Sequence, residues 1–323
     1  MIDDDENELP HPLDLPALSS KPSFRTLVSI LQKLTPPPPS WSVQAKTPRS
    51  SYNYTPWLTR LVATPTPWLT DTESDTIISM ASNNLALRAG RTAAPNMTRT
   101  FTVDNHDIVL FEPSWTGDSI GHKTWGASLL LARRFSTLHS FSTSAILGPT
   151  SKCKCLGLGE GTGLLGIAAV KVMSWTVTLT DLPCIIPNLK RNVDFNCSER
   201  ADVLALDWMD PPPNEIIGFN SFDVVIGSDL FYDSHHPGLV VEMIRRYLKK
   251  DSESRMVIAF PLRKSHTAEI VDFEEGMAAS FTIEHSGEEV GMDDWDTEIH
   301  CKWVIYRWKD KAYLNNTVVD GYS

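Results

Sequence analysis

Lys152–Val170 reads KCKCLGLGEGTGLLGIAAV, a short apolar run that breaks into glycines and then resumes with helical spacing. The apolar residues before the glycines suit a buried strand, and those after them suit a helix packed on a sheet. Between the two lie Gly157, Gly159, Gly161 and Gly163. Glycines adopt backbone torsions that other residues avoid, and they let a ligand approach the main chain closely. The stretch therefore predicts a strand, a tight loop and a helix that cradle part of a nucleotide or nucleoside cofactor.

The spacing within this loop leaves two cofactor classes open. Gly161-x-Gly163-x-x-Gly166, followed by Asp181, comes close to the dinucleotide fingerprint, in which the acid binds a ribose hydroxyl. S-adenosylmethionine enzymes use a similar loop, so the choice depends on the remainder of the chain. The chain lacks the Tyr-x-x-x-Lys pair of a short-chain dehydrogenase, which weakens the hydride-transfer interpretation.

Composition excludes several partners for this chain of 323 residues with a net charge of −11. Direct nucleic-acid binding is not expected, because phosphate contacts need clustered Lys and Arg, whereas an acidic protein suits basic partners. The five cysteines are interpreted as reduced and mostly buried. Cys153-x-Cys155 lacks zinc-ligand spacing, so no metal is predicted. Without a basic leader or a run long enough to cross a bilayer, a cytoplasmic or nuclear monomer without a membrane partner is expected.

Four regions follow one another along the chain. Residues 1–70 form a proline-rich, largely irregular extension with a short helix at 24–34, and little fixed structure is expected over its first 22 residues. Residues 71–121 are expected to hold an accessory helix and a β-ribbon. The main domain spans 122–310, and 311–323 form a tail.

Strands and helices alternate after the glycine loop, which predicts an α/β fold with a doubly wound, mostly parallel sheet of seven strands. The first strand is the one that enters the glycine loop. The others are expected at 175–180, 203–206, 222–227, 256–260, 281–285 and 301–308. Because no helix separates the last two, the final strand is expected to run antiparallel. Ligands of such sheets lie outside the carboxyl ends of the strands.

Acidic and aromatic residues stand where these strands end. Asp181 closes the second strand, where its carboxylate can accept hydrogen bonds from ribose hydroxyls, with helix capping as the alternative. Asp207 and Trp208 close the third strand and suit an adenine amine and an adenine face, with core packing as the alternative for the indole. Asp229 and Tyr232 follow the fourth strand, where they can line a narrow channel and hold an ammonium group.

Such a channel suits methyl transfer to an amine. In a dry channel the pKa of a lysine falls below its reference value of about 10.4, which helps to deliver the neutral amine. A sulfonium methyl group is already activated, so the enzyme mainly aligns and desolvates the reactants. An acidic loop expected at 288–298 would attract a basic protein to the site, although a solvated hairpin explains the same residues.

The motifs KTWGASLLLARRF, LGLGEGTGLLGI, LTDLP, LDW and DVVIGSDLFYD follow one another in this order. Over residues 108–308 they resemble the family 16 seven-β-strand methyltransferases, which are chiefly protein lysine methyltransferases. The resemblance implies a Rossmann-like class I methyltransferase domain at 122–310 and S-adenosylmethionine as the cofactor. It places Asp229 and Tyr232 at the target lysine. The cofactor contacts that it implies are Trp125, Gly159, Glu160, Gly161, Asp181, Trp208 and Ser228, to which the loop and the strand end add Gly163 and Asp207.

The proline-rich extension is similar to that of fungal members that act on translation elongation factors, so a lysine of such a factor is the expected substrate. A small-molecule N-methyltransferase, for instance one acting on nicotinamide, is the first alternative. A module that binds the cofactor without catalysis is the second, because Gly157 stands where the family usually has an acid. Glu160 is the residue that could replace this acid.

Overall fold

The structure, a computed structural model, describes residues 9–36, 52–90, 93–114, 120–292 and 298–309. It divides into two compact units, Met1–Met97 and Thr98–Ser323. The tail predicted at 311–323 lies outside the described residues, as does the part of the acidic loop at 293–297. Each unit has a hydrophobic core of its own.

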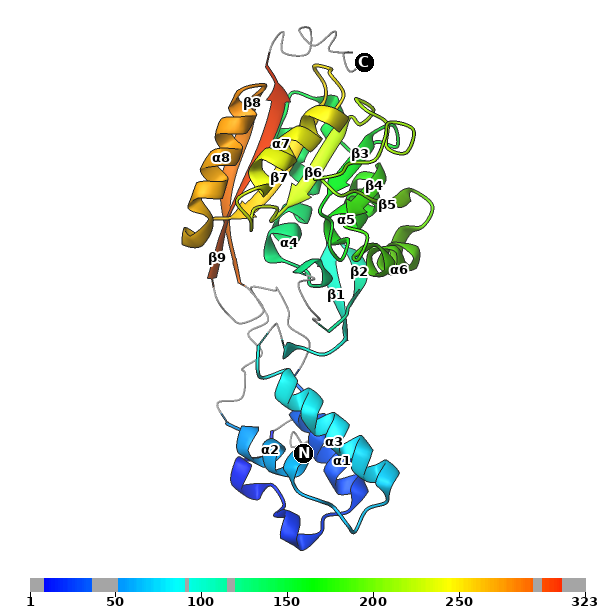
Figure 1. Ribbon diagram of the computed structural model, residues 1–323, viewed down its shortest axis with the longest axis vertical. Helices are drawn as coiled ribbons and strands as arrows, with labels where there is room; N and C mark the ends of the chain where they lie inside the picture. The colour runs from blue at the N-terminus through cyan, green and yellow to red at the C-terminus, as the bar shows by residue number, and fades with distance from the viewer. Residues whose placement is uncertain (1–8, 37–51, 91–92, 115–119, 293–297, 310–323) are drawn as a thin grey trace, which may run out of the picture. The chain divides into compact units, whose positions relative to one another are not determined.

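The first unit contains α1 (Phe24–Leu34), α2 (Thr55–Ala63) and α3 (Asp71–Ala86) (Figure 1). The sequence predicts α1 and α3 but interprets the stretch that contains α2 as irregular. α2 forms because Pro56 stands in its first turn, where the missing N–H would have no helical partner. α3 belongs to this unit, whereas the sequence analysis groups it with the β-ribbon. The leucines of α1 and α2 share one core with Ile77 and Ala81 of α3.

Aromatic side chains fix the segment that precedes α1. Proline carbonyls accept hydrogen bonds from the polar atoms of these rings, which gives order to residues 9–22, where the sequence predicts little fixed structure. The pairs are Tyr54 Oη to Pro10 O at 2.8 Å, Trp57 Nε1 to Pro16 O at 3.0 Å and Trp68 Nε1 to Pro22 O at 2.9 Å.

The second unit is organised around a seven-stranded sheet in the order β5-β4-β3-β6-β7-β9-β8 (Figure 1). The first five of these strands are parallel, and β9 runs antiparallel to both of its neighbours. The predicted α/β fold with its antiparallel last strand is confirmed. The strands are β3 (Lys154–Leu158), β4 (Thr176–Asp181), β5 (Ala201–Ala205), β6 (Val224–Ser228), β7 (Arg255–Pro261), β8 (Phe281–Met292) and β9 (Glu298–Trp308).

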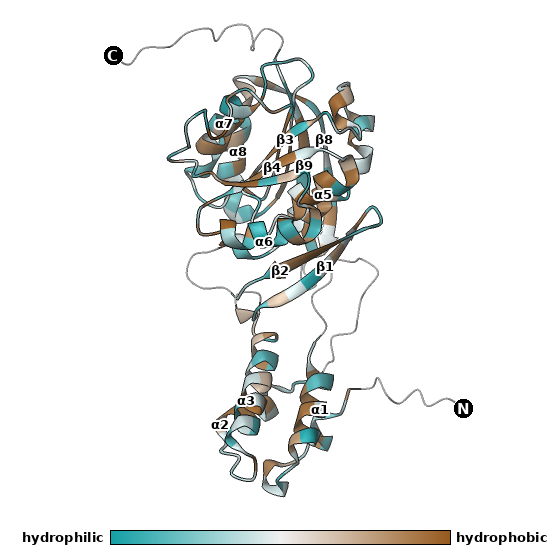
Figure 2. Ribbon diagram, turned by 90° about the vertical axis from the view of Figure 1, so that its right-hand side faces the viewer, coloured by the Kyte–Doolittle hydropathy of each residue, from teal (hydrophilic) through white to brown (hydrophobic). Residues whose placement is uncertain are grey.

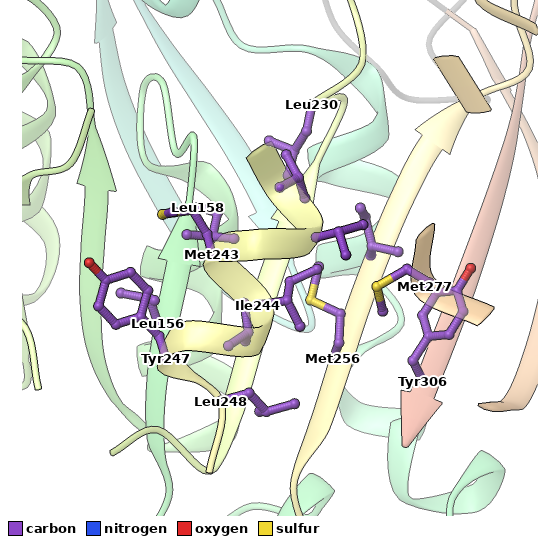
Figure 3. Close-up of a cluster of buried hydrophobic side chains, with 14 of the residues drawn as sticks. Leu156, Leu158, Leu230, Met243, Ile244, Tyr247, Leu248, Met256, Met277 and Tyr306 are labelled. Carbon is purple, nitrogen blue, oxygen red and sulfur yellow. The ribbon is translucent and has the colours of Figure 1, made fainter. Parts of the chain in front are cut away.

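Helices cover both faces of this sheet. They are α4 (Gly126–Ala132), α5 (Leu164–Met173), α6 (Ile186–Cys197), α7 (His236–Tyr247) and α8 (Thr267–Ala278). α7 and α8 lie on the face that carries Leu156 (Figure 3). α5 lies on the opposite face, because Gly166 in α5 packs against Leu179, which is paired with Gly157 in the sheet. The sheet is thus buried between two helical layers, as a parallel sheet requires.

Two elements differ from the sequence prediction. The sequence of residues 123–138 has apolar residues at helical spacing and predicts one amphipathic helix, but this segment divides into α4 and a 3-10 helix at Phe135–Phe141. The strand expected at 281–285 continues to Met292, so that Glu288 and Glu289 lie in β8 and not in a loop. β8 is the edge strand of the sheet, and its charged residues follow from its exposure to solvent.

A separate hairpin of β1 (Met97–Val103) and β2 (His106–Glu112) lies beside α6 (Figure 2). Its turn residues, Asp104 and Asn105, have φ values of 47° and 65°, a left-handed conformation that Asp and Asn tolerate. The prediction of a β-ribbon at this place is met by these two strands.

Asparagine side chains of α6 attach this hairpin to the domain. Asn192 accepts a hydrogen bond from the Phe111 amide at 2.9 Å and donates to the Phe111 carbonyl at 3.1 Å. Asn196 makes the same pair of contacts with Val109, one helical turn further on. Asn188 also donates to the Phe111 carbonyl, at 3.1 Å. The amides of α6 therefore serve β2 as a neighbouring strand would.

Asn192→Leu is expected to destabilise the domain by about 2–4 kcal/mol, because it leaves the Phe111 N–H and the Thr162 carbonyl buried without a partner. The free energy of unfolding in urea measures this effect. Asn196→Leu is the matched control and should cost about 1 kcal/mol, since water can replace its half-buried amide. Equal losses in the two variants would contradict this account.

Candidate active site

The loop between β3 and α5 can hold only glycine at several positions. Gly159, Gly161 and Gly163 have φ values of +59°, +58° and +90°. A Cβ on Gly159 would lie 2.8 Å from Leu230 and 3.3 Å from the indole of Trp208. The torsions and the close neighbours both require the glycines that the sequence provides. At these three positions the loop backbone therefore carries no side chain at the carboxyl edge of the sheet.

Glu160 fills the space beside Gly157. Its Oε2 accepts a hydrogen bond from the Gly166 amide at 2.9 Å. A Cβ built on Gly157 would overlap the carboxyl group of Glu160, so any side chain at position 157 requires Glu160 to leave its present position. Glu160 Oε1 is buried and has no hydrogen-bond partner among the described residues. Burial raises the pKa of Glu160 to about 8, partly offset by the Gly166 hydrogen bond.

Asp181 shapes the same loop from the end of β4. One carboxylate oxygen accepts a hydrogen bond from the Gly161 amide, and the other accepts one from the Leu182 amide, each at 2.7 Å. Burial raises the pKa of Asp181 to about 6, although both hydrogen bonds oppose the shift. A carboxylate retains further acceptor capacity after two such bonds, so a hydroxyl can still be bound.

Trp208 is connected to Tyr232 through an imidazole. The ring of His236 meets the Trp208 ring at 5.6 Å and the Tyr232 ring at 4.3 Å between centroids, both edge to face. Burial lowers the pKa of His236, so this imidazole is neutral at pH 7. Burial and the nearby carboxylates raise the pKa of Tyr232 to about 12, although part of its ring is exposed. Asp207 accepts a hydrogen bond from the Met209 amide at 2.9 Å and so closes the turn that presents Trp208.

Asp229 is held firmly at the exit of β6. Its φ of 54° is unusual for a residue other than glycine, and its amide donates to the Ala259 carbonyl at 2.9 Å. Its carboxylate accepts two hydrogen bonds from the Arg263 guanidinium, at 2.9 and 2.8 Å. Ser228 is the last residue of β6 and is paired with Ala259. Both carboxylate oxygens of Asp229 are thus bonded to a cation from the segment that follows β7, the neighbouring strand.

Trp125 lies on the other side of this cation. The Arg263 guanidinium carbon is 5.6 Å from the centre of the Trp125 ring, and the indole donates to the Ile120 carbonyl at 3.2 Å. The structure therefore brings Trp125 and Asp229, which are far apart in sequence, to one arginine. The sequence analysis missed Arg263, although its place after β7, at a strand end, is the signal that could have found it.

A buried chain of polar contacts, also missed, connects the hairpin to the glycine loop. Arg99 pairs with Glu112 at 3.0 Å, and both side chains are almost fully buried. Glu112 also accepts from the Thr124 amide at 3.1 Å, and the hydroxyls of Thr124 and Thr162 are 2.8 Å apart. Thr162 lies in the loop itself, between two of its glycines.

Two acids of the expected acidic loop form ion pairs with neighbouring side chains. Glu289 accepts two hydrogen bonds from Arg134, at 3.1 and 3.0 Å, and Glu298 pairs with His300 at 2.6 Å. Residues 293–297 lie outside the described part of the chain. Among the residues that are described, Glu289 is therefore less available to attract a basic partner than the sequence suggests.

The sheet order, the glycine loop after β3 and the acid after β4 define a Rossmann-like methyltransferase. The sequence pattern described as lysine methyltransferase matches residues 103–275, more than half of the chain, which therefore belongs to this family. Methyl transfer in this family makes S-adenosylmethionine the cofactor, as the resemblance predicts. No helix within the described ranges is long and apolar enough to cross a membrane.

Known relatives agree with this family. Protein-lysine N-methyltransferase rrg1 of Schizosaccharomyces pombe is 35% identical over 312 residues, which cover 92% of this chain and 97% of the relative. Protein-lysine N-methyltransferase EFM2 of Saccharomyces cerevisiae is 31% identical over 238 residues, which cover 68% of this chain and 56% of the relative. EEF1A lysine methyltransferase 3 of Xenopus tropicalis is 36% identical over 84 residues, 24% of this chain and 34% of the relative. The chain is an S-adenosylmethionine-dependent protein-lysine N-methyltransferase.

The residues at the carboxyl edge fit this cofactor. The glycines let the loop backbone pack closely against its neighbours, and Glu160 offers a buried acceptor that has no partner among the described residues to a group that carries positive charge. S-adenosylmethionine has such groups, an ammonium and a sulfonium.

Glu160→Gln is expected to flatten the dependence of stability on pH in the ligand-free protein. Because the folded-state pKa of about 8 exceeds the reference of 4.5, the protonated acid contributes stability that is complete below pH 4.5 and is lost as pH rises to about 8. Asp181 acts in the same direction up to about pH 6, so Glu160 still contributes between pH 6.5 and 8 where Asp181 no longer does. Urea unfolding across this interval should show a smaller loss in Glu160→Gln than in the wild type. The exposed control Glu199→Gln should keep the wild-type slope, and a wild-type slope in Glu160→Gln would refute the assignment.

Proposed function

We propose that this enzyme methylates the side-chain amine of a lysine in a translation elongation factor. The observation that carries the proposal is the Asp229–Tyr232 element at the exit of β6, on the same sheet edge as the glycine loop. The name of the relative EEF1A lysine methyltransferase 3 supports elongation factor 1A as the substrate. The cytoplasm, where translation factors act, is the proposed location.

The glycine loop and its acids hold the cofactor in this proposal. Gly159, Gly161 and Gly163 let it approach the backbone, and Glu160 Oε1 accepts from its cationic amino group. Asp181 accepts from ribose hydroxyls with its remaining acceptor capacity. These contacts use atoms that the folded chain leaves available.

Aromatic and turn residues complete the cofactor site. Trp208 covers one face of the adenine beside Gly159, Asp207 and its turn receive the adenine amine, and Trp125 and Ser228 border the opposite side. When bound, S-adenosylmethionine supplies an activated methyl group whose transfer leaves the electron pair of the broken carbon–sulfur bond on sulfur.

The chain itself aligns the amine and excludes water. Tyr232 forms a wall of the lysine channel, with a hydroxyl that stays protonated because its pKa is raised to about 12. Asp229 accepts a hydrogen bond from the amine through acceptor positions that Arg263 does not use. The target lysine releases its proton to water before transfer, so the chain needs no dedicated base.

Glu160→Gln should weaken S-adenosylmethionine binding and remove most of its dependence on pH between 6 and 7.5. In the wild type a cationic ligand binds the ionised acid, so affinity should rise with pH by up to about tenfold per unit below the pKa of about 8. Isothermal titration of both proteins with S-adenosylmethionine measures the effect. Equal affinity of the two proteins at pH 7.5 would exclude Glu160 from the site.

The substrate is tested with tritiated S-adenosylmethionine and a lysate of cells that lack this enzyme. One labelled band at the mass of elongation factor 1A, identified as methyl-lysine by mass spectrometry, is expected. Asp229→Ala should lower the label at least about a hundredfold, because the channel loses a positioning hydrogen bond and a charged pair. The exposed Asp272→Asn on α8 is the control that keeps the label. A different labelled protein would refute the elongation factor, and turnover of free nicotinamide would favour the small-molecule alternative.

A further inference from the structure

We propose that Arg263 is a positioning residue that prevents Asp229 from holding the target lysine as an ammonium ion, and thereby sets the pH at which methyl transfer proceeds. The inference rests on the proposed function, because it assumes that a lysine amine enters beside Asp229. It assigns a role to Arg263, which the sequence motifs do not include.

In the ion pair of Asp229 and Arg263, the charge of the carboxylate is balanced by the guanidinium. Both oxygens of Asp229 accept from the guanidinium of Arg263, at 2.9 and 2.8 Å, and the Asp229 side chain is only 6% exposed. The Arg263 side chain is 35% exposed and lies over the ring of Trp125. An incoming amine therefore meets an ion pair without net charge. The guanidinium is the more exposed partner of this pair.

Methyl transfer makes a conflicting demand on this acid. The amine must be neutral to have a free electron pair, yet at a reference pKa of about 10.4 only about one lysine in a thousand is neutral near pH 7.4. A lone buried carboxylate would favour the ammonium form and raise the lysine pKa further, whereas a nearby cation lowers it. Pairing Asp229 with Arg263 keeps a hydrogen-bond acceptor for the amine and removes the excess negative charge.

The neighbouring titratable groups do not replace Arg263 in this role. Cys301 on β9 faces both partners, and burial raises its pKa to about 12, so it is a neutral thiol. Tyr232 is a neutral phenol for the same reason. Glu289 on β8 also acts on Cys301, and its charge is balanced by Arg134.

Two more carboxylates act on Tyr232 from the cofactor side of the channel. They are Asp181, whose oxygens accept two backbone amides, and Asp233, which pairs with His235. Cys184 also lies within electrostatic range of Tyr232. The two carboxylates add negative charge around the amine, which makes the cation at Arg263 more necessary for a neutral nucleophile.

The backbone holds the ion pair in advance of substrate. Asp229 is anchored by its amide to Ala259 in β7, and Arg263 by its amide to the Pro261 carbonyl at 3.0 Å. Leu262 donates to the His300 carbonyl of β9 at 2.7 Å. The fork of an arginine matches a carboxylate with two parallel bonds, which a lysine at this position would not.

The experiment measures kcat against pH, from pH 6.5 to 10, with saturating S-adenosylmethionine and saturating elongation factor 1A purified from cells that lack this enzyme. Rates under saturation report the pKa of the amine in the complex. Arg263→Gln should move the alkaline rise of kcat upward by at least about one pH unit, which is about a tenfold loss at pH 7.5. The loss should shrink steadily as the pH rises toward 10, because the neutral fraction of the amine saturates in the wild type before it does in the variant.

Two matched variants separate charge from structure. Arg263→Lys keeps the cation but loses the paired hydrogen bonds, so kcat should fall while the pH midpoint stays within about 0.3 of the wild type. Arg246→Gln removes a second arginine that pairs with a carboxylate and lies over an aromatic ring, and its midpoint should not move. A loss in Arg263→Gln by the same factor at every pH would overturn the inference and indicate a structural role.

The proposed function is distinguished from this inference by the wild type. If the wild type labels another protein, the same profiles on that protein test Arg263 while the elongation factor is abandoned. If it forms methyl-lysine but Arg263→Gln keeps the wild-type midpoint, only the role of Arg263 is refuted. If it forms no methyl-lysine on any protein, both proposals are overturned.

Discussion

The glycine loop depends on two buried carboxylates that organise its backbone. Asp181 accepts the amides of Gly161 and Leu182, and Glu160 accepts the amide of Gly166. Burial raises the pKa of both acids, and among the described residues no cation lies beside either of them to offset it. The loop is thus a preformed but electrostatically incomplete cradle, and a positively charged ligand completes it. Stability and cofactor binding are therefore coupled in this domain through the same two side chains.

Contacts from outside the sheet keep this cradle in place. Thr162 is linked to the hairpin through Thr124 and through the buried pair of Arg99 and Glu112. Asn192 reaches the carbonyl of Thr162 from α6 at 2.9 Å. The hairpin before the sheet is therefore part of the active-site support, since its loss would leave buried polar groups around the loop without partners.

Local pattern was sufficient to predict the strands, the glycine loop and the acids at the strand ends, because these features depend on residues close in sequence. Arg263 escaped prediction because it meets Asp229 across 34 positions, and no local spacing marks such a pair. The close approach of the Glu160 side chain to Gly157 likewise exists only once the loop folds back on β3. The acidic residues of β8 were predicted to form a loop, but β8 is an edge strand whose acids face solvent. The segment that contains α2 was predicted to be irregular because of its prolines. The roles of the site residues remain predictions that the proposed variants test.

The site treats its acids in opposite ways, and the chemistry of methyl transfer explains the difference. Glu160 has a buried oxygen without a partner among the described residues, so in the proposed site it suits a ligand group that keeps its positive charge. Asp229 already has a cation on both oxygens, so it accepts a hydrogen bond without selecting for a charged donor. A cofactor must stay bound as a cation, whereas the lysine must lose its proton to react. One sheet edge can satisfy both demands. Asp229 after β6 and Arg263 after β7 lie side by side, whereas Glu160 after β3 has no such arginine beside it among the described residues.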